Sequence, residues 1–238
     1  NTTVKDSLGN QVVVPAGFKV VNKDANVTDG IVVEDVSHSA TAGSQFVWIP
    51  VGEVVKDSAG NKETITLGRY VFNKDGKIDT ALSKTEPGDQ LKTSSSDTLY
   101  YTEGLKDSTT SNTHAKDIED FKNKVTNTTH GYYIGRYESR TSTERKSKTD
   151  KLTQITVKPD EYVYNYTTQL QAAELSRGMY SSDSNFESDL MNSYAWDTAV
   201  YFLQKFDNRE NKDSLTPYSQ QTSLNDSLAS QGTNNLSD

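Results

Sequence analysis

The strongest constraint on this chain is its shortage of core-forming side chains. Valine, leucine, isoleucine and phenylalanine together make up 48 of its 238 residues, about 20%, which is the level at which chains begin to lack the apolar surface needed to fold. Serine, threonine and asparagine supply another 71 residues. A packed core therefore requires that the apolar residues be concentrated, and their strongest runs lie at 11–33, 46–72, 131–137 and 186–206.

The first part of the chain has the pattern of short β-strands separated by turns. Apolar runs at 11–14, 18–21 and 31–33 alternate with stretches rich in Asn, Asp and Gly, which are typical of turns. The most apolar stretch is 46–52, and Pro50 within it indicates either that this strand is not a central one or where the strand leaves its sheet. A further strand is predicted over 64–72.

The middle of the chain predicts a helix followed by a strand. Ile118, Phe121 and Val125 recur at helical spacing, which predicts a short helix over 116–126. Aromatic and β-branched residues then predict a strand over 131–138.

Two more helices are predicted in the later part, over 167–177 with Gly178 as a C-terminal cap, and over 186–206. The segments 83–115 and 139–160 show little periodicity and many polar residues. We interpret both as long surface insertions.

These elements predict an α+β fold with short twisted antiparallel strands, two or three helices and long loop insertions. We divide the chain into N-terminal strands at 1–30, which form a candidate assembly arm, a main domain at 31–206 and a polar C-terminal segment at 207–238.

The charge of the chain argues against a nucleic-acid partner. Its formal net charge is −8, whereas phosphate binding requires a basic face. One basic cluster exists, and we interpret it as a solvated loop: Arg140, Arg145, Lys146, Lys148 and Lys151.

The chain contains no cysteine, which excludes disulfides, thiolate metal sites and cysteine nucleophiles. No apolar run approaches the roughly 18 residues of a membrane span. We therefore expect a protein without a membrane span. The cysteine count does not set the compartment, and we interpret the chain as secreted or exposed on a cell surface.

Three segments, taken in order, have the pattern of a known family. Segment 45–52 (QFVWIPVG) ends in Ile-Pro-x-Gly, segment 131–138 (GYYIGRYE) is similar to a strand of the form Phe-Tyr-Ile-x-x-x-Glu, and segment 193–202 (SYAWDTAVYF) contains Trp-x-x-Ala. Together they resemble the sulfatase-modifying-factor family, whose members have the formylglycine-generating-enzyme version of the C-type lectin fold. The resemblance covers roughly 31–206 and implies that fold here.

The departures from the family pattern concern catalysis. Enzymes of that family work through cysteines or a metal site in the C-terminal half, and this chain has no cysteine. The family's late Asn-x-Trp-Glu-Trp and Arg-Gly-Gly-Ser-Trp segments are also absent, since no tryptophan follows Trp196. The resemblance therefore implies a non-catalytic relative that is either C-terminally shortened or cut before its last core strands.

Four aromatic residues are the candidate ligand-binding residues, because aromatic faces stack on sugars: Trp48, Tyr132, Tyr133 and Trp196. The favoured alternative is that both tryptophans belong to the core, because the chain is poor in aliphatic residues.

Few titratable residues suggest catalysis. Arg136 and Glu138 alternate with aromatic residues on a predicted strand, which favours a structural ion pair over an acid–base catalyst. His38, His114 and His130 lie far apart in polar segments. They show neither metal-ligand spacing nor a nucleophile–base pattern.

One stretch resembles part of a calcium loop. It contains Asn73, Asp75, Gly76 and Asp79, but the first ligand position of the loop pattern would be Val71. A plain β-turn is favoured, so we predict no metal site and no cofactor and retain calcium as the alternative.

The sequence predicts a non-enzymatic structural or adhesive subunit that associates with copies of itself or with another surface protein. A strand from residues 2–14 would be added to a neighbour's sheet edge. The alternative is a lectin-like module that binds a receptor or glycan through the insertions 83–115 and 139–160. An enzyme of the sulfatase-modifying class is a third alternative, for which the sequence offers no metal site or nucleophile.

Overall fold

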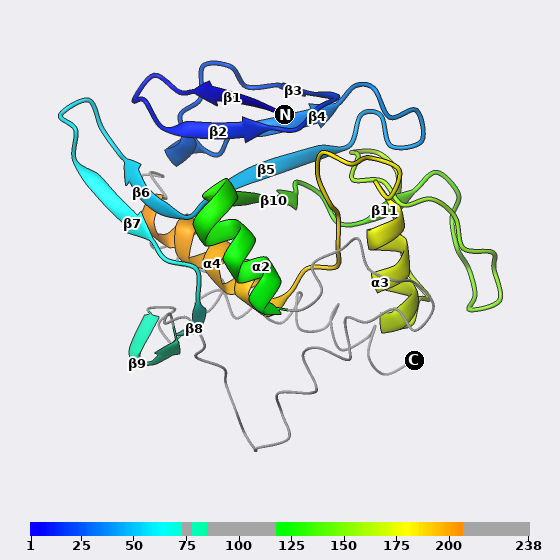
Figure 1. The fold of residues 1–238 in the computed structure, drawn as a ribbon. Coiled ribbons are helices and arrows are strands. Elements are labelled where there is room, and N and C mark those ends of the chain that lie inside the picture. Colours follow the sequence, from blue (N-terminus) through cyan, green and yellow to red (C-terminus); the bar gives the residue numbers. More distant parts are fainter. Residues whose placement is uncertain (73–77, 85–117, 207–238) are drawn as a thin grey trace.

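The structure, a computed structural model, describes residues 1–72, 78–84 and 118–206. The described chain combines small antiparallel sheets with helices (Figure 1), so the predicted α+β class is confirmed. Most of the predicted insertion 83–115 and the C-terminal segment 207–238 lie outside the described residues.

The elements are short, as the turn-rich sequence indicates. The strands are β1 (Thr2–Lys5), β2 (Gln11–Val14), β3 (Phe18–Val20), β4 (Val32–Asp35), β5 (Gln45–Pro50), β6 (Gly52–Val55), β7 (Lys62–Ile65), β8 (Arg69–Phe72), β9 (Ile78–Lys84), β10 (Gly131–Gly135), β11 (Arg140–Thr141) and β12 (Tyr162–Val163). The helical segments are a 3-10 turn (Val27–Asp29), α2 (Ile118–Lys124), a π-helical turn (Val125–Thr129), α3 (Gln169–Gly178) and α4 (Ser193–Phe206).

The centre of the fold is a four-stranded antiparallel sheet in the order β10-β5-β4-β3. β5 pairs with β10 so that Trp48 lies opposite Tyr133 and Ile49 opposite Tyr132. β5 ends at Pro50, as predicted, because proline has no N–H to donate to a ladder. In Figure 1 the hairpin β1–β2 lies on one side of β5, and α2 and α4 lie on the other.

The first thirty residues belong to the same packed body as the rest. β3 is the fourth strand of the central sheet, and Val12, Val14 and Val27 are buried in the main core. The boundary that we placed at residue 30 therefore falls inside one sheet.

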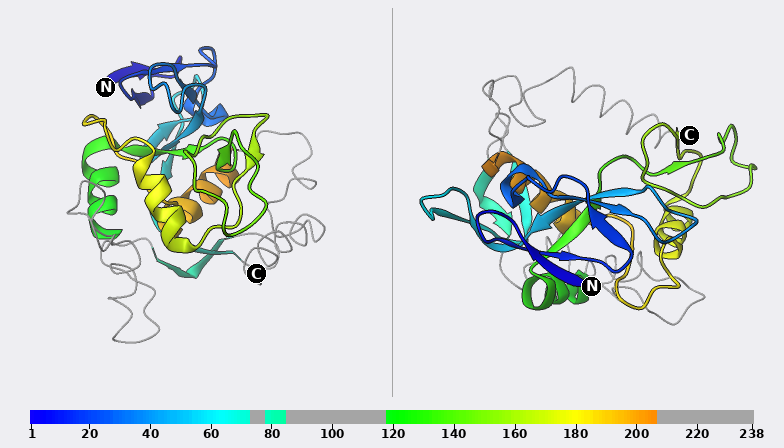
Figure 2. Two further views of the ribbon diagram at one scale, coloured as in Figure 1. Left: turned by 90° about the vertical axis from the view of Figure 1, so that its right-hand side faces the viewer. Right: turned by 90° about the horizontal axis from the view of Figure 1, so that it is seen from above.

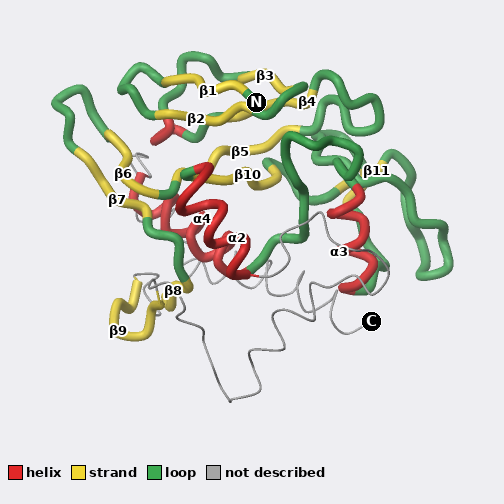
Figure 3. Tube along the Cα trace, in the orientation of Figure 1, coloured by secondary structure: helices red, strands yellow, loops and turns green. Residues whose placement is uncertain are grey.

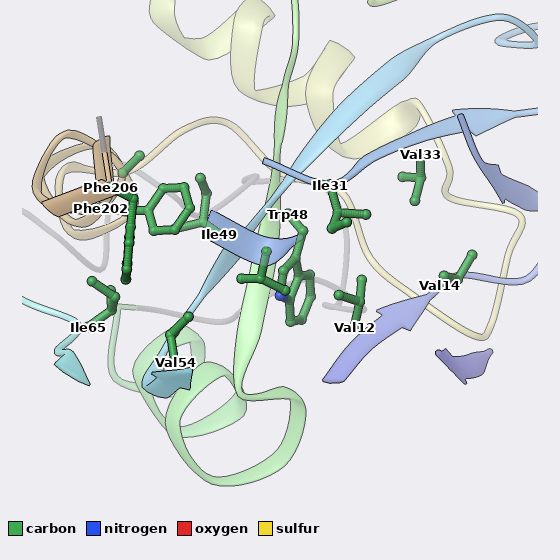
Figure 4. Close-up of a cluster of buried hydrophobic side chains, with 12 residues drawn as sticks. Val12, Val14, Ile31, Val33, Trp48, Ile49, Val54, Ile65, Phe202 and Phe206 are labelled. Atoms are coloured by element: carbon green, nitrogen blue, oxygen red, sulfur yellow. The ribbon is translucent and has the colours of Figure 1, made fainter. Parts of the chain in front are cut away.

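The main core is built from side chains that reach it from many short elements. β2, β4, β5, β6, β7 and α4 each contribute to one cluster, and burial of each large side chain contributes roughly 1.5–3 kcal/mol. Figure 4 shows Trp48 near its centre with Val12 and Ile31 close by, while Phe202 and Phe206 enter from α4.

The predicted strand over 64–72 is wrong as a single element, because the chain turns between β7 and β8. The Gly68 N–H donates to Thr198 Oγ1 over 3.1 Å. Asp197 Oδ2 accepts from Arg69 Nε at 2.7 Å and from the Tyr70 N–H at 3.0 Å. These hydrogen bonds attach the turn between β7 and β8 to the first half of α4.

The predicted helix over 186–206 is also too long, since α4 begins at Ser193. Asn192 Oδ1 accepts from the Ala195 N–H at 2.9 Å, in the manner of an N-terminal cap. Phe186 lies outside the helix because its ring packs against Tyr180, with 5.1 Å between the ring centres.

Two smaller boundaries differ from the prediction. The helix predicted over 116–126 is α2 continued by the π-helical turn. The strand predicted over 131–138 is β10, which ends at Gly135.

α3 agrees with the prediction except at its end. Thr168 caps its start, accepting from the Gln171 N–H at 3.2 Å, while Gln171 Oε1 accepts from the Thr168 N–H at 3.0 Å. Gly178, predicted as the cap beyond the helix, is its last residue, and Met179 with right-handed helical backbone occupies the C-cap.

The predicted insertion 139–160 is not a surface loop throughout. Ile155 and Val157 are buried in a separate cluster with Met179 and Tyr180. The segment therefore contributes its own small core beside the central sheet.

Arg145 corrects the interpretation of the basic cluster as solvated. Its side chain is 3% exposed. Nε donates to the carbonyl oxygen of Asn165 at 3.1 Å, Nη1 to that of Asp150 at 2.7 Å and Nη2 to that of Tyr166 at 3.0 Å. The buried side chain of Arg145 thus joins two parts of this loop region by hydrogen bonds to their backbones.

Gly131→Ala is expected to destabilise the fold. A Cβ at this position would lie 2.2 Å from Trp48 Cζ2 and 2.7 Å from the Ile49 carbonyl oxygen, where backbone leaves little room to relax. Overpacking of this kind costs about 1–3 kcal/mol, measurable by urea unfolding.

Gly178→Ala is the matched control. A Cβ there meets nothing within 4 Å, and alanine is favoured over glycine in a helix by about 0.5–1 kcal/mol. Equal loss of stability in both variants would contradict the close approach at Gly131.

Candidate functional site

The four predicted ligand-binding aromatics do not form one surface. Trp48 is 2% exposed and its ring centre lies 5.0 Å from that of Tyr133. Trp196, on α4, is 55% exposed. The favoured alternative, that both tryptophans are core residues, is therefore correct for Trp48 and wrong for Trp196.

The two tyrosines of β10 have structural roles. Tyr132 Oη donates to the Ala195 carbonyl oxygen at 2.6 Å, and Tyr133 Oη donates to that of Val13 at 3.0 Å. Burial raises the pKa of both phenols. They join β10 to α4 on one side and to β2 on the other, and neither hydroxyl is free for a ligand.

The ion pair expected between Arg136 and Glu138 is not formed in the described structure. Both residues are exposed beyond the end of β10. Arg136 Nη1 instead donates to Gln45 Oε1 at 2.6 Å, and its guanidinium lies 5.5 Å from the centre of the Tyr137 ring. The strand ends before Glu138, so the alternation that would have paired the two side chains is lost.

A cluster of charged side chains lies around His38. Its Nδ1 is 2.9 Å from Asp35 Oδ1 and its Nε2 is 3.2 Å from Asp183 Oδ2. Asp35 ends β4, whereas Asp183 lies between α3 and α4. We call His38, Asp35 and Asp183 the histidine clamp, since the ring joins two segments distant in sequence.

Asp35 is the buried end of the clamp, with 1% of its side chain exposed. Besides His38 Nδ1, its Oδ1 accepts from the backbone N–H groups of His38 and Ser37 at 3.0 and 3.2 Å. Its Oδ2 accepts from Thr41 Oγ1 at 2.5 Å and from Tyr180 Oη at 3.1 Å. A buried carboxylate needs such donors to offset its lost hydration.

Aromatic rings surround the imidazole of His38. Ring centres lie 5.7 Å away for Phe18, 5.3 Å for Tyr180 and 5.8 Å for Phe186. The imidazole is 22% exposed, so its contacts are only partly screened by water. These rings come from β3, which pairs with β4, and from the segment between α3 and α4.

The clamp shifts the pKa values of all three groups. Burial lowers the pKa of His38, but the hydrogen bonds and charges of Asp35 and Asp183 outweigh it and raise that pKa. Burial raises the pKa of Asp35, and hydrogen bonds from Thr41 and His38 outweigh it, so the pKa is lowered. The Asn185 N–H and then His38 lower the pKa of Asp183.

This geometry favours an electrostatic tie over acid–base chemistry. A histidine that acts as a base needs one ring nitrogen directed at its substrate while a carboxylate orients the other. In His38 both nitrogens face carboxylates. A doubly protonated ring donates to both, which favours the charged form and ties the segment around Asp183 to the end of β4.

Sequence reasoning overlooked the clamp. Asp35 and His38 are three residues apart, which is the only local signal, whereas Asp183 is 145 residues from His38. His130 lies elsewhere, exposed after the π-helical turn. His114 lies outside the described residues.

The part of the chain that the structure describes contains neither a metal-binding group nor a membrane-spanning helix. Those residues contain no group of three or more His, Asp or Glu side chains placed to hold a metal ion. Most of the calcium-like stretch, 73–77, lies outside them. None of the described helices is long and apolar enough to cross a membrane.

Comparison of the chain with protein-family models, with curated proteins and with solved structures finds no match.

The histidine clamp predicts a pH-dependent stability. Because folding raises the pKa of His38, its contribution is complete below its ordinary value of 6.5 and is lost as the pH rises through the higher folded-state pKa. Because folding lowers the pKa of Asp35 and Asp183, their contribution is present above their ordinary value of 3.8 and is lost as the pH falls through the lower folded-state values. The clamp is therefore strongest between these limits.

We expect His38→Asn to lower the free energy of urea unfolding by about 1–2 kcal/mol at pH 5, which allows for partial solvent screening. The difference from the wild type should shrink at pH 9. His130→Asn is the control, and its free energy of unfolding should equal that of the wild type at both pH 5 and pH 9. A His38→Asn effect of the same size at pH 5 and pH 9 would contradict a charged clamp.

Proposed function

We propose that this chain is a non-enzymatic subunit of an extracellular or cell-surface structure and that it associates with copies of itself through an exposed strand edge. The observation that carries the proposal is the unpaired outer edge of β1. The engagement of both ring nitrogens of His38 in the clamp also favours a structural role.

The outer edge of β1 is available for strand addition. β1 forms a two-stranded sheet with β2, in the register Thr2 to Val14 and Lys5 to Gln11. In an antiparallel pair, alternate residues direct N–H and C=O groups away from the partner strand. Among the described residues no other strand pairs with that edge. Figure 2 shows the hairpin at one end of the molecule.

The sequence predicts that a strand from residues 2–14 pairs with an exposed sheet edge of a neighbour. In the structure this segment forms two strands, β1 and β2, which pair with each other. Val12 and Val14 are buried in the main core, so they cannot leave it at low cost. The hairpin therefore offers an edge to a neighbour and stays on its own domain.

A second copy of the chain fits this edge. Antiparallel pairing of two β1 strands about a two-fold axis would place Thr3 opposite its own copy and Thr2 opposite Val4. No like charges would face each other, and the two hairpins would join into one continuous sheet.

The proposal includes a C-type-lectin-like domain related to the sulfatase-modifying factors. Its support is that the three resembling segments lie together. β5 pairs with β10, and α4 contributes Ala199 to the cluster that contains Trp48 and Ile49.

The association is tested with variants of β1. Thr2→Lys combined with Thr3→Lys places added like charges across the proposed two-fold pairing, so the dimer should dissociate. Removal of residues 1–5 should have the same effect and leaves Val12 and Val14 in the core. The molar mass from size-exclusion chromatography with light scattering is the measurement.

The matched control carries Thr64→Lys with Thr66→Lys, two exposed threonines at the β7 hairpin. It should keep the wild-type mass. A wild-type chain that is monomeric at every concentration tested, or variants of β1 with unchanged mass, would overturn the proposal.

A further inference from the structure

Tyr166 has a backbone conformation that its side chain does not favour. Its φ is 55°, in the left-handed region that costs a residue with a Cβ roughly 1–2 kcal/mol. The side chain is 43% exposed. Glycine or asparagine adopts this backbone more easily, and core packing does not require a phenol ring here.

The buried guanidinium of Arg145 stabilises this conformation. The guanidinium donates hydrogen bonds to the carbonyl oxygens of Asn165 and Tyr166 at 3.1 and 3.0 Å. It also lies 5.4 Å from the centre of the Tyr164 ring. Tyr164 in turn is tied to Thr153, whose N–H donates to Tyr164 Oη at 2.9 Å. The backbone that bears the exposed ring of Tyr166 is thus held by hydrogen bonds from a buried side chain.

The same guanidinium binds the backbone of Tyr166 and that of a turn that carries lysines. Arg145 Nη1 donates to the Asp150 carbonyl oxygen at 2.7 Å. The Asp150 carboxylate closes the preceding turn by accepting from the Lys146 N–H at 2.7 Å. Lys148 is within this turn and Lys151 follows it. Figure 3 shows that the chain between β10 and α3 is mostly loop.

The lysines give this surface a local positive charge. Residues 140–151 hold five cations and two anions, whereas the whole chain has a formal net charge of −8. Lys146, Lys148 and Lys151 are exposed. Within the described residues, Lys146 pairs with Glu144 at 3.3 Å, and no ion pair is formed by Lys148 or Lys151.

We propose that Tyr166, Lys148 and Lys151 form a binding surface for an acidic polysaccharide. The exposed ring provides an apolar face for a sugar ring, and the ammonium groups complement carboxylate or sulfate groups along the polymer. Backbone strain at an exposed residue is typical of binding sites, where the surrounding structure maintains it. The surface is separate from the β1 edge and does not depend on self-association.

Binding is measured by calorimetry with polygalacturonate and dextran sulfate, at low and at physiological salt. Neutral dextran and duplex DNA are the comparison polymers. We expect the wild type to bind the acidic polysaccharides, more weakly as salt rises, and to bind neither dextran nor DNA.

Tyr166→Gly separates binding from folding. It should reduce the affinity about tenfold, which is typical of the loss of one aromatic stack. Its thermal unfolding midpoint should equal or exceed that of the wild type, because glycine relieves the backbone strain. Trp196→Ala removes an exposed aromatic from α4 and should leave the affinity unchanged.

Lys148→Glu with Lys151→Glu should also weaken binding at least about tenfold and reduce its salt dependence. The control is Lys23→Glu with Lys56→Glu, which changes the net charge equally at exposed positions elsewhere. Absence of wild-type binding, equal affinity for DNA, unchanged binding by Tyr166→Gly, or an equal loss in the control pairs would each overturn the proposal.

Discussion

The pairing of β5 with β10 is the interaction on which the rest of the structure depends. It joins residues more than eighty positions apart and seats the Trp48 indole directly against Gly131, a position with no space for a side chain. β4 and β3 extend the sheet on one side, and α4 closes the core around the same indole. In a chain with so few large aliphatic residues, one deeply buried tryptophan supplies apolar contact area that would otherwise require two or three of them. The hydroxyls of Tyr132 and Tyr133 then attach the strand to both neighbouring layers.

Buried polar groups complement this lean core at three separate places. Asp35, Arg145 and Asp197 are each largely buried, and each has at least one hydrogen-bond partner 21 or more positions away in sequence. Such groups stabilise a fold only when their hydrogen-bonding capacity is met. Here the partners are backbone amides, backbone carbonyls and hydroxyl groups, together with the side chains of His38 and Arg69. A chain rich in serine and threonine has hydroxyl groups in excess. The high hydroxyl content thus serves the interior as well as the surface. The clamp around His38 adds charge to one of these places, so its strength follows the pH.

The sequence pattern predicted the elements that depend on interactions between neighbouring residues. It missed the features that depend on contacts between residues distant in sequence. The strands β2, β3 and β5 and the helix α3 were predicted within a few residues, because alternation, proline and a capping threonine act within a few residues of the chain. The strand over 64–72 was predicted without its break at Gly68, since the bonds that turn the chain there come from α4. The start of α4 was misplaced because Phe186 packs against Tyr180. Of the candidate site residues, Trp48 is buried, as a core poor in aliphatic residues would require, whereas Trp196 on α4 is exposed.

The sequence by itself determined the α+β class, the acidic charge, the absence of cysteine chemistry and the positions of β2, β3, β4, β5 and β10, since composition and short-range periodicity express these properties directly. Only the tertiary structure decided which side chains meet. It joined His38 to Asp183, fastened Tyr166 and the lysine turn to one guanidinium, and kept β1 beside β2. The physical reason is that ion pairs and hydrogen bonds of this kind act over about 3 Å in space and are indifferent to separation along the chain. A single sequence records the donors and acceptors, and folding alone selects their partners.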